Sequence, residues 1–147
     1  MVISGQCVRA EFAAEPQSPC LARRLVRSTL HGWQLDHLEE TATLLVSELA
    51  TNAVLHARTR FLLVAEQRDA LVRVSVFDCA ATAPARRHHG VQSGTGRGIG
   101  LIAVLACSWG TDTEVRPWAK VVWFELPTDP EALPQPADGA LLAGWPA

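Results

Sequence analysis

The sequence lacks the long apolar runs and the charge excess that mark several protein classes. None of its apolar runs approaches the roughly 20 residues of a membrane-spanning helix. The formal net charge is -2, from 13 Lys and Arg against 15 Asp and Glu, so no overall basic field points to nucleic acid. The first residues show neither the basic start nor the apolar stretch of a signal peptide. We expect a cytoplasmic protein that binds neither nucleic acid nor a membrane.

Paired cysteines and metal-binding histidine motifs are also missing. The cysteines lie far apart, at Cys7, Cys20, Cys79 and Cys107. Because no C-x-x-C pair occurs, we do not expect a zinc ribbon or a thioredoxin-type motif. The histidines form no H-E-x-x-H or other metal-binding signature. An unpaired cysteine is usually a small buried hydrophobe, so we expect these side chains to be buried.

The composition that is present suits one folded domain. The chain has 147 residues, of which 48% are hydrophobic and 19% charged. Five of the nine prolines fall within residues 127–147. We therefore expect a domain over residues 6–126 and a mostly irregular, proline-rich tail over residues 127–147, with a short docking turn near its end.

Helical periodicity and capping residues predict two N-terminal helices. Ser18 is expected to cap a helix over residues 20–30. Asp36 is expected to cap the second helix, with Glu39 completing a capping box. Apolar residues then recur with a helical period as far as Ala57, which predicts one long amphipathic helix.

Alternating segments elsewhere predict a sheet. The expected strands are residues 8–13, 61–67, 71–78, 109–116 and 119–126. Residues 79–96 show no periodicity and read as a long loop, and residues 97–107 predict a helix buried nearly all round. This mixture predicts an α+β two-layer sandwich, with a mixed, mostly antiparallel sheet covered by helices on one face.

The long helix carries three polar residues at four-residue spacing. Glu48, Asn52 and His56 are expected to lie along one line beside the apolar stripe. They could be a polar flank, with Asn52 satisfied by local bonds. Alternatively, an amide oxygen there could bind Mg²⁺, and a carboxylate one turn away could accept a proton.

Asp78 continues a row of valines that is expected to face the core. A carboxylate in such a row is costly unless it is paired or hydrogen-bonded. Asp78 could cap the turn that follows the strand. It could also accept a hydrogen bond from the exocyclic amine of a ligand such as adenine.

A glycine-rich segment precedes the helix expected at residues 97–107. Glycines alternate through residues 94–100, and Arg97 lies among them. Such a turn at a helix N-terminus can bind an anion through backbone N–H groups, although it could also be a hinge or a tight packing site. Residues 79–111 contain no acid, whereas Arg86, Arg87, His88 and His89 lie there. This local positive charge would favour a polyphosphate, or it could be a solvated loop.

Together and in this order, these segments resemble the histidine-kinase-like (GHKL) ATPases, most of all a small stand-alone actinobacterial branch related to anti-sigma-factor serine/threonine kinases. The resemblance covers nearly all of residues 8–126. It rests on SELATNAVLHA (47–57), VFD (76–78), GRGIGL (96–101), WG (109–110) and KVVWF (120–124).

The resemblance implies a Bergerat-type ATP-binding fold and a set of nucleotide contacts. Asn52 would bind Mg²⁺, Glu48 would be the catalytic base or a carboxylate that orients water, and His56 would support them. Asp78 would receive the adenine amino group. The remaining expected nucleotide-binding positions are Gly96, Arg97, Gly98, Gly100, Leu101 and Lys120.

Two segments depart from the family pattern. The family usually has D-x-G-x-G, where this chain has Cys79 and alanines after Asp78. The last strand usually carries Gly-Lys-Thr, where this chain has Ala119, Lys120 and Val121. The adenine side is therefore altered more than the phosphate side.

The resemblance implies an ATP-dependent serine/threonine protein kinase that regulates transcription with Mg-ATP. Its protein partner would be a sigma factor or a small anti-sigma antagonist, and an exposed sheet edge beside the first strand would allow a homodimer. The alternative is a non-catalytic nucleotide-binding regulator with a degenerate adenine site, which the two departures favour.

Overall fold

The structure, a computed structural model, describes residues 6–80, 100 and 102–132. Its alternating segments form the strands β1 Gln6–Phe12, β2 Phe61–Arg68, β3 Leu71–Asp78, β4 Ser108–Asp112 and β5 Lys120–Pro127. They pair in the order β1-β2-β3-β5-β4, with β1 at one edge. Every pair is antiparallel, so the described sheet is not mixed as expected.

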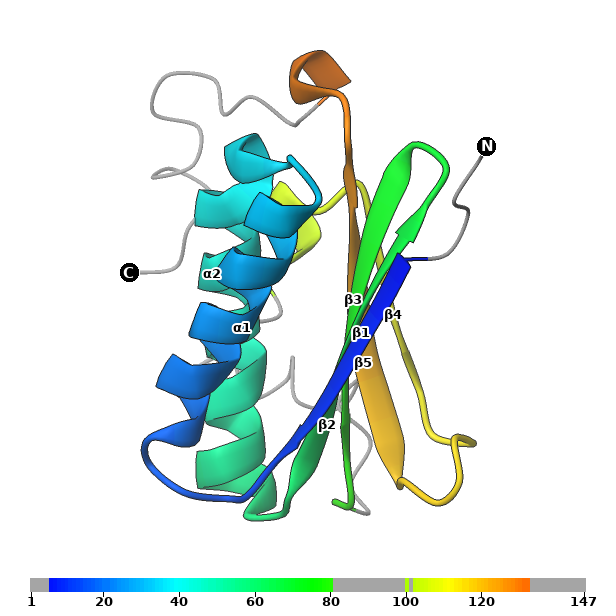
Figure 1. Cartoon of the computed structure of the whole chain (residues 1–147). Helices are drawn as coiled ribbons and strands as arrows, with labels where there is room; N and C mark the ends of the chain where they lie inside the picture. Colours follow the sequence, from blue (N-terminus) through cyan, green and yellow to red (C-terminus); the bar gives the residue numbers. More distant parts are fainter. Residues whose placement is uncertain (1–5, 81–99, 101, 133–147) are drawn as a thin grey trace.

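Two helices, α1 Ser18–Gly32 and α2 Glu39–Asn52, pack on one face of this sheet (Figure 1). Short helical turns flank them, η1 Asp36–Leu38 before α2 and η2 Ala53–Ala57 after it, and η4 Pro130–Ala132 follows β5. Residues 102–105 are also helical. The α+β class and the two layers are therefore as predicted.

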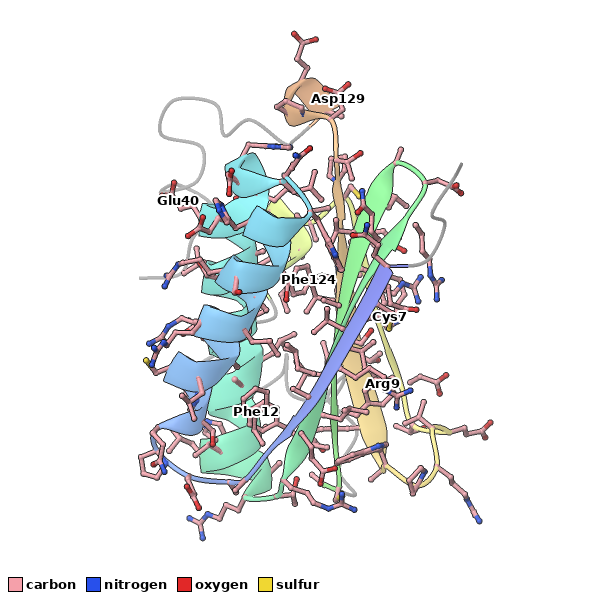
Figure 2. The ribbon with its side chains drawn as sticks, in the orientation of Figure 1. Cys7, Arg9, Phe12, Glu40, Phe124 and Asp129 are labelled. Atoms are coloured by element: carbon pink, nitrogen blue, oxygen red, sulfur yellow. The ribbon has the colours of Figure 1, made fainter. Side chains whose placement is uncertain are left out.

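The core lies between the helices and the sheet. Phe61 and Phe124 of the sheet are fully buried there, together with Leu45 of α2 and Leu30 of α1. Figure 2 shows Phe124 between the layers, and Cys7 and Arg9 on the opposite face of the sheet. Burying each large apolar side chain stabilises the fold by roughly 1.5–3 kcal/mol, so this layer dominates its stability.

The opposite face of the sheet carries a second, smaller apolar cluster. Leu62 and Val64 of β2 are buried there against Trp118. Trp118 also lies 6.5 Å from Phe77 between ring centroids, and the guanidinium of Arg60 lies 4.5 Å from the Trp118 ring centroid. The connection between β4 and β5 therefore folds back over this face.

The predicted helix caps are wrong. Gln17 is the N-cap of α1, and Ser18 lies inside the helix, where its hydroxyl donates to the carbonyl of Ala13 at 2.7 Å. Asp36 begins η1 without a side-chain cap and instead binds His31 at 2.8 Å. In both places the polar side chain has a partner five residues earlier in the chain, which competes with the cap.

The long helix predicted as far as Ala57 changes character at Asn52. Residues 53–57 form a π-helical turn, and Arg58 then adopts a left-handed conformation with φ 57°. The carbonyl of Ala53 accepts the N–H of Thr59 at 3.4 Å, which closes the wide turn. The chain must reverse here to begin β2, and the wider turn accompanies that reversal.

Other boundaries also differ from the prediction. β4 ends at Asp112, four residues early, because the Asp112 carboxylate accepts the N–H of Glu114 and starts a turn. The expected helix over 97–107 has left its helical conformation by Ala106, and Val104 is 44% exposed rather than buried. β5 includes Pro127, which was expected to begin the tail.

The cysteines are not buried as expected. Cys7, Cys20 and Cys107 are exposed, and Cys79 is half-buried. Cys7 lies on the face of the sheet that is turned away from the helices, and Cys20 lies on the outer side of α1. Position in the element, rather than the apolar character of the thiol, decides their exposure. The expected docking turn of the tail lies in residues 133–147, outside the described residues.

Candidate functional site

Glu48 and Asn52 lie one turn apart in the regular part of α2. The buried residues Leu45 and Leu49 set the face that α2 turns to the sheet, and Asn52 follows Leu49 at the border of that face. Both polar side chains are half-buried, and neither makes a hydrogen bond or ion pair with another described residue. The local bonds expected for a structural Asn52 are therefore not seen, and the oxygens remain accessible to a ligand.

The rotation of α2 is fixed by contacts with α1. The Arg23 guanidinium donates to the hydroxyl of Ser47 at 2.8 Å, and Arg27 pairs with Glu39 at 2.7 Å. These contacts lie on the side of α2 next to α1. Glu48 follows Ser47 directly. It therefore lies at the border of the buried face that is turned away from α1.

Asp78 ends β3 on the face that is turned to the helices. Val72, Val74 and Val76 precede it in the same row and belong to the core. Asp78 itself is 5% exposed. The prediction that this carboxylate continues a buried row is confirmed, so its charge must be compensated locally.

Lys120 supplies part of that compensation. Asp78 and Lys120 are direct partners in the register of β3 and β5, and both side chains are at least nine-tenths buried. The ammonium nitrogen lies 3.6 Å from Oδ2 of Asp78. Oδ1 accepts the backbone N–H of Ala80 at 2.9 Å, so Asp78 also caps the following turn, as one of the two interpretations predicts.

Strand pairing brings this charge pair to the end of the molecule where α2 finishes. Phe61, the first residue of β2, is the register partner of Asp78 and follows the π-helical turn closely in sequence. The hydroxyl of Thr59 accepts the N–H of Cys79 at 3.1 Å. The last turns of α2 and the Asp78–Lys120 pair are thus joined through one short segment.

The glycine-rich segment is described only at Gly100. Gly96, Arg97, Gly98 and Leu101 lie outside the described residues, as do the basic residues 86–89. Gly100 is helical and half-buried, and a side-chain carbon added there would meet nothing within 4 Å. The helical residues 102–105 lie toward the end at which α2 begins (Figure 1), so the described residues do not bring Gly100 to Asp78.

The pairing of Lys120 with Asp78 was not predicted from the amino-acid sequence. The only local signal was that each charged residue stands at the end of an apolar strand. Their contact depends on β5 pairing with β3, which no local pattern encodes. His56 lies in the π-helical turn and is exposed. Its predicted alignment with Glu48 and Asn52 assumed a regular α-helix, which ends before His56.

No three His, Cys, Asp or Glu side chains gather as a metal site within residues 6–80, 100 and 102–132. Mg²⁺ often takes only one or two protein oxygens and shares its shell with phosphates and water, and the Asn52 amide with the nearby Glu48 carboxylate fits that donor chemistry.

Neither a family model nor a curated protein matches this sequence. The described helices include none with the length and apolar character that a membrane crossing requires.

Proposed function

We propose that the chain is an ATP-binding regulatory protein with a Bergerat-type fold, acting as a serine/threonine protein kinase of the anti-sigma-factor type. The single observation that carries this proposal is the pair Glu48 and Asn52, one turn apart and without protein partners in the described residues. The buried Asp78 at the same end of the molecule and the resemblance of residues 8–126 to GHKL ATPases support it.

Each group has a chemical part in this proposal. The amide oxygen of Asn52 would bind Mg²⁺, which neutralises phosphate charge when present. In the transfer, the hydroxyl oxygen of a serine or threonine on a small protein antagonist bonds to the γ-phosphorus as the bond to the bridging oxygen of ADP breaks. The hydroxyl proton passes to Glu48, and ADP leaves with the bridging electron pair.

A second candidate function is a nucleotide-binding regulator without transfer activity. One observation favours it: both oxygens of Asp78 already have protein partners, the N–H of Ala80 and the ammonium of Lys120. An adenine amine would have to share this carboxylate, which would weaken base recognition.

Calorimetric titration with Mg-ATP tests the binding site. We expect Asn52→Ala to abolish Mg-ATP binding while the circular dichroism spectrum stays unchanged, because the half-exposed amide has no structural partner among the described residues. Thr51→Ala, on the preceding residue of the same helix, is the matched control and should bind normally. Unchanged Mg-ATP affinity in Asn52→Ala would show that the metal assignment is wrong.

Incubation with γ-labelled ATP and purified sigma factors or their antagonists separates the two functions. A kinase places label on a partner hydroxyl, and Glu48→Gln loses it because the proton acceptor is gone. Glu40→Gln, at an exposed carboxylate on the same helix, should retain transfer. Tight Mg-ATP binding without transfer to any of these partners, or to water, would favour the regulator.

A further inference from the structure

A basic hollow lies on the helical layer, between the second half of α1 and the start of α2. Its volume is about 410 Å³, and its lining residues are Arg24, Arg27, Ser28 and His31 of α1 and Glu39, the first residue of α2. The four α1 residues are spaced so that they share one face of the helix. The hollow therefore gathers three basic side chains and one hydroxyl.

Contacts within the fold do not account for all of this charge. Arg23 is half-buried and donates to the hydroxyl of Ser47, which holds α1 against α2. Its neighbour Arg24 is exposed and makes no hydrogen bond or ion pair with another described residue. The helix α1 contains no acidic residue, although the whole chain has a formal charge of -2. The excess of positive charge is therefore confined to this helix, and packing does not explain it at Arg24.

The donors that remain in the hollow suit an anion with several oxygens. Arg27 uses Nε for Glu39, at 2.7 Å, which leaves four of its five side-chain N–H donors. The Ser28 hydroxyl has no partner among the described residues. His31 binds Asp36 through Nδ1, and this hydrogen bond raises the pKa of His31, which favours the ring with a second N–H at Nε2. These donors outnumber the roughly four lone-pair sites of a carboxylate.

We propose that this hollow binds a phosphorylated serine or threonine side chain of a protein partner. A phosphate monoester carries about two negative charges and three acceptor oxygens, so it can accept from two guanidiniums and a hydroxyl together. The lining contains no hydrophobic residue. A membrane surface or an apolar helix would need such residues, so neither is favoured as the occupant.

This inference is separate from the proposed nucleotide site. Glu39 begins α2 and Asn52 ends it, which places them about 20 Å apart by the rise of a helix. A phosphate group beside Glu39 is therefore too far from Asn52 to share its ligands. The hollow can be tested without ATP, and its failure would leave the proposed function untouched.

The test is fluorescence anisotropy of a labelled glycine pentapeptide with a central phosphoserine, titrated with the full chain. We expect it to bind at least about tenfold more tightly than the same peptide with serine. Arg24→Gln should weaken binding of the phosphopeptide about tenfold, because a charge-assisted bidentate contact is lost. Arg24→Lys keeps the charge without the fork and should lose about threefold.

Arg9→Gln is the matched control. It removes the same charge from an exposed position on the face of the sheet that is turned away from the helices, and it should bind the phosphopeptide normally (Figure 2). Circular dichroism should show every variant folded, because both arginines are exposed. Three competitors complete the test: the peptide with glutamate, inorganic phosphate, and vesicles of phosphatidylcholine and phosphatidylserine in equal parts.

Each adverse outcome overturns a named part of the inference. Equal binding of the phosphoserine and serine peptides overturns it outright, as does an Arg24→Gln variant that binds like the native chain or an equal loss in Arg9→Gln. If the glutamate peptide competes as well as the phosphopeptide, the hollow selects an acidic segment and the phosphate assignment is wrong. If inorganic phosphate or the vesicles compete as well, the assignment to a protein partner is wrong.

Discussion

Two carboxylates in this chain bind neighbouring cations in opposite environments. Asp36 pairs with His31 on the surface, where water screens the charges and the interaction contributes little to stability. Asp78 pairs with Lys120 at nine-tenths burial, where removing one partner leaves an uncompensated charge. We therefore expect substitution of Asp36 to change the titration of His31. Substitution of Lys120 should destabilise the fold or change ligand binding.

The surface pair predicts a shifted histidine titration. The hydrogen bond that the His31 ring donates to the Asp36 carboxylate, together with the negative charge of Asp36, raises the pKa of His31 above its ordinary value of 6.5. Because the folded-state pKa is raised, the stabilisation is complete below pH 6.5 and is lost as pH rises through the raised value. Proton NMR should show the His31 midpoint above 6.5 in the native chain and closer to 6.5 in Asp36→Asn.

Glu40→Gln is the control for that titration, because Glu40 is not among the groups that shift His31. An Asp36→Asn midpoint equal to that of the native chain would mean that the contact does not form in solution.

At the scale of elements, the orientation of α2 determines where the residues of the candidate site lie. Its apolar stripe faces the sheet, and its contacts with α1 fix its rotation, so Glu48 and Asn52 lie at the border of the buried face. The π-helical turn that follows connects this border to β2 and, through strand pairing, to Asp78. A small rotation of α2 would therefore change both the core and the site.

Neighbouring leucines on α2 test this rotation. Leu45 is fully buried and Leu44 is 44% exposed. We expect Leu45→Ala to lower the free energy of unfolding by about 2–5 kcal/mol, because it leaves a cavity in the core. Leu44→Ala should cost less than about 1 kcal/mol. Urea denaturation measures both, and equal losses would show that α2 turns a different face to the sheet.

At the scale of the molecule, the two faces of the sheet are covered by different means. Helices cover one face (Figure 1), whereas Trp118, in the connection between β4 and β5, packs with Leu62 and Val64 on the other. This second cluster keeps apolar residues from forming an exposed patch, which would promote association. The burial of Leu62 and Val64 on this face thus depends on the short connection between β4 and β5.

Removing Trp118 should expose that face without dismantling the core. We expect Trp118→Ala to lower the free energy of unfolding by about 3 kcal/mol and to increase binding of an apolar fluorescent dye. Trp109→Ala, at a tryptophan that is 39% exposed on β4, is the comparison and should cost about half as much. Unchanged stability and dye binding in Trp118→Ala would mean that Trp118 does not cover Leu62 and Val64.

The amino-acid sequence by itself determined the element types, the two-layer class and the buried row that ends at Asp78. These follow from periodicity, because a repeat of two or 3.6 residues decides which side chains face the core. The placement of Glu48 and Asn52 one turn apart on α2 follows in the same way, since spacing within one helix is a local property.

Only the tertiary structure decided the caps, the π-helical turn and the partner of Asp78. Ser18 and Asp36 are good caps by residue type, yet in the folded chain they bind Ala13 and His31, because the turns before α1 and η1 bring these residues close. Lys120 contacts Asp78 because β5 pairs with β3, although the two residues are 42 positions apart in the sequence. Such pairing depends on the order of strands in the whole sheet, which short-range patterns do not encode.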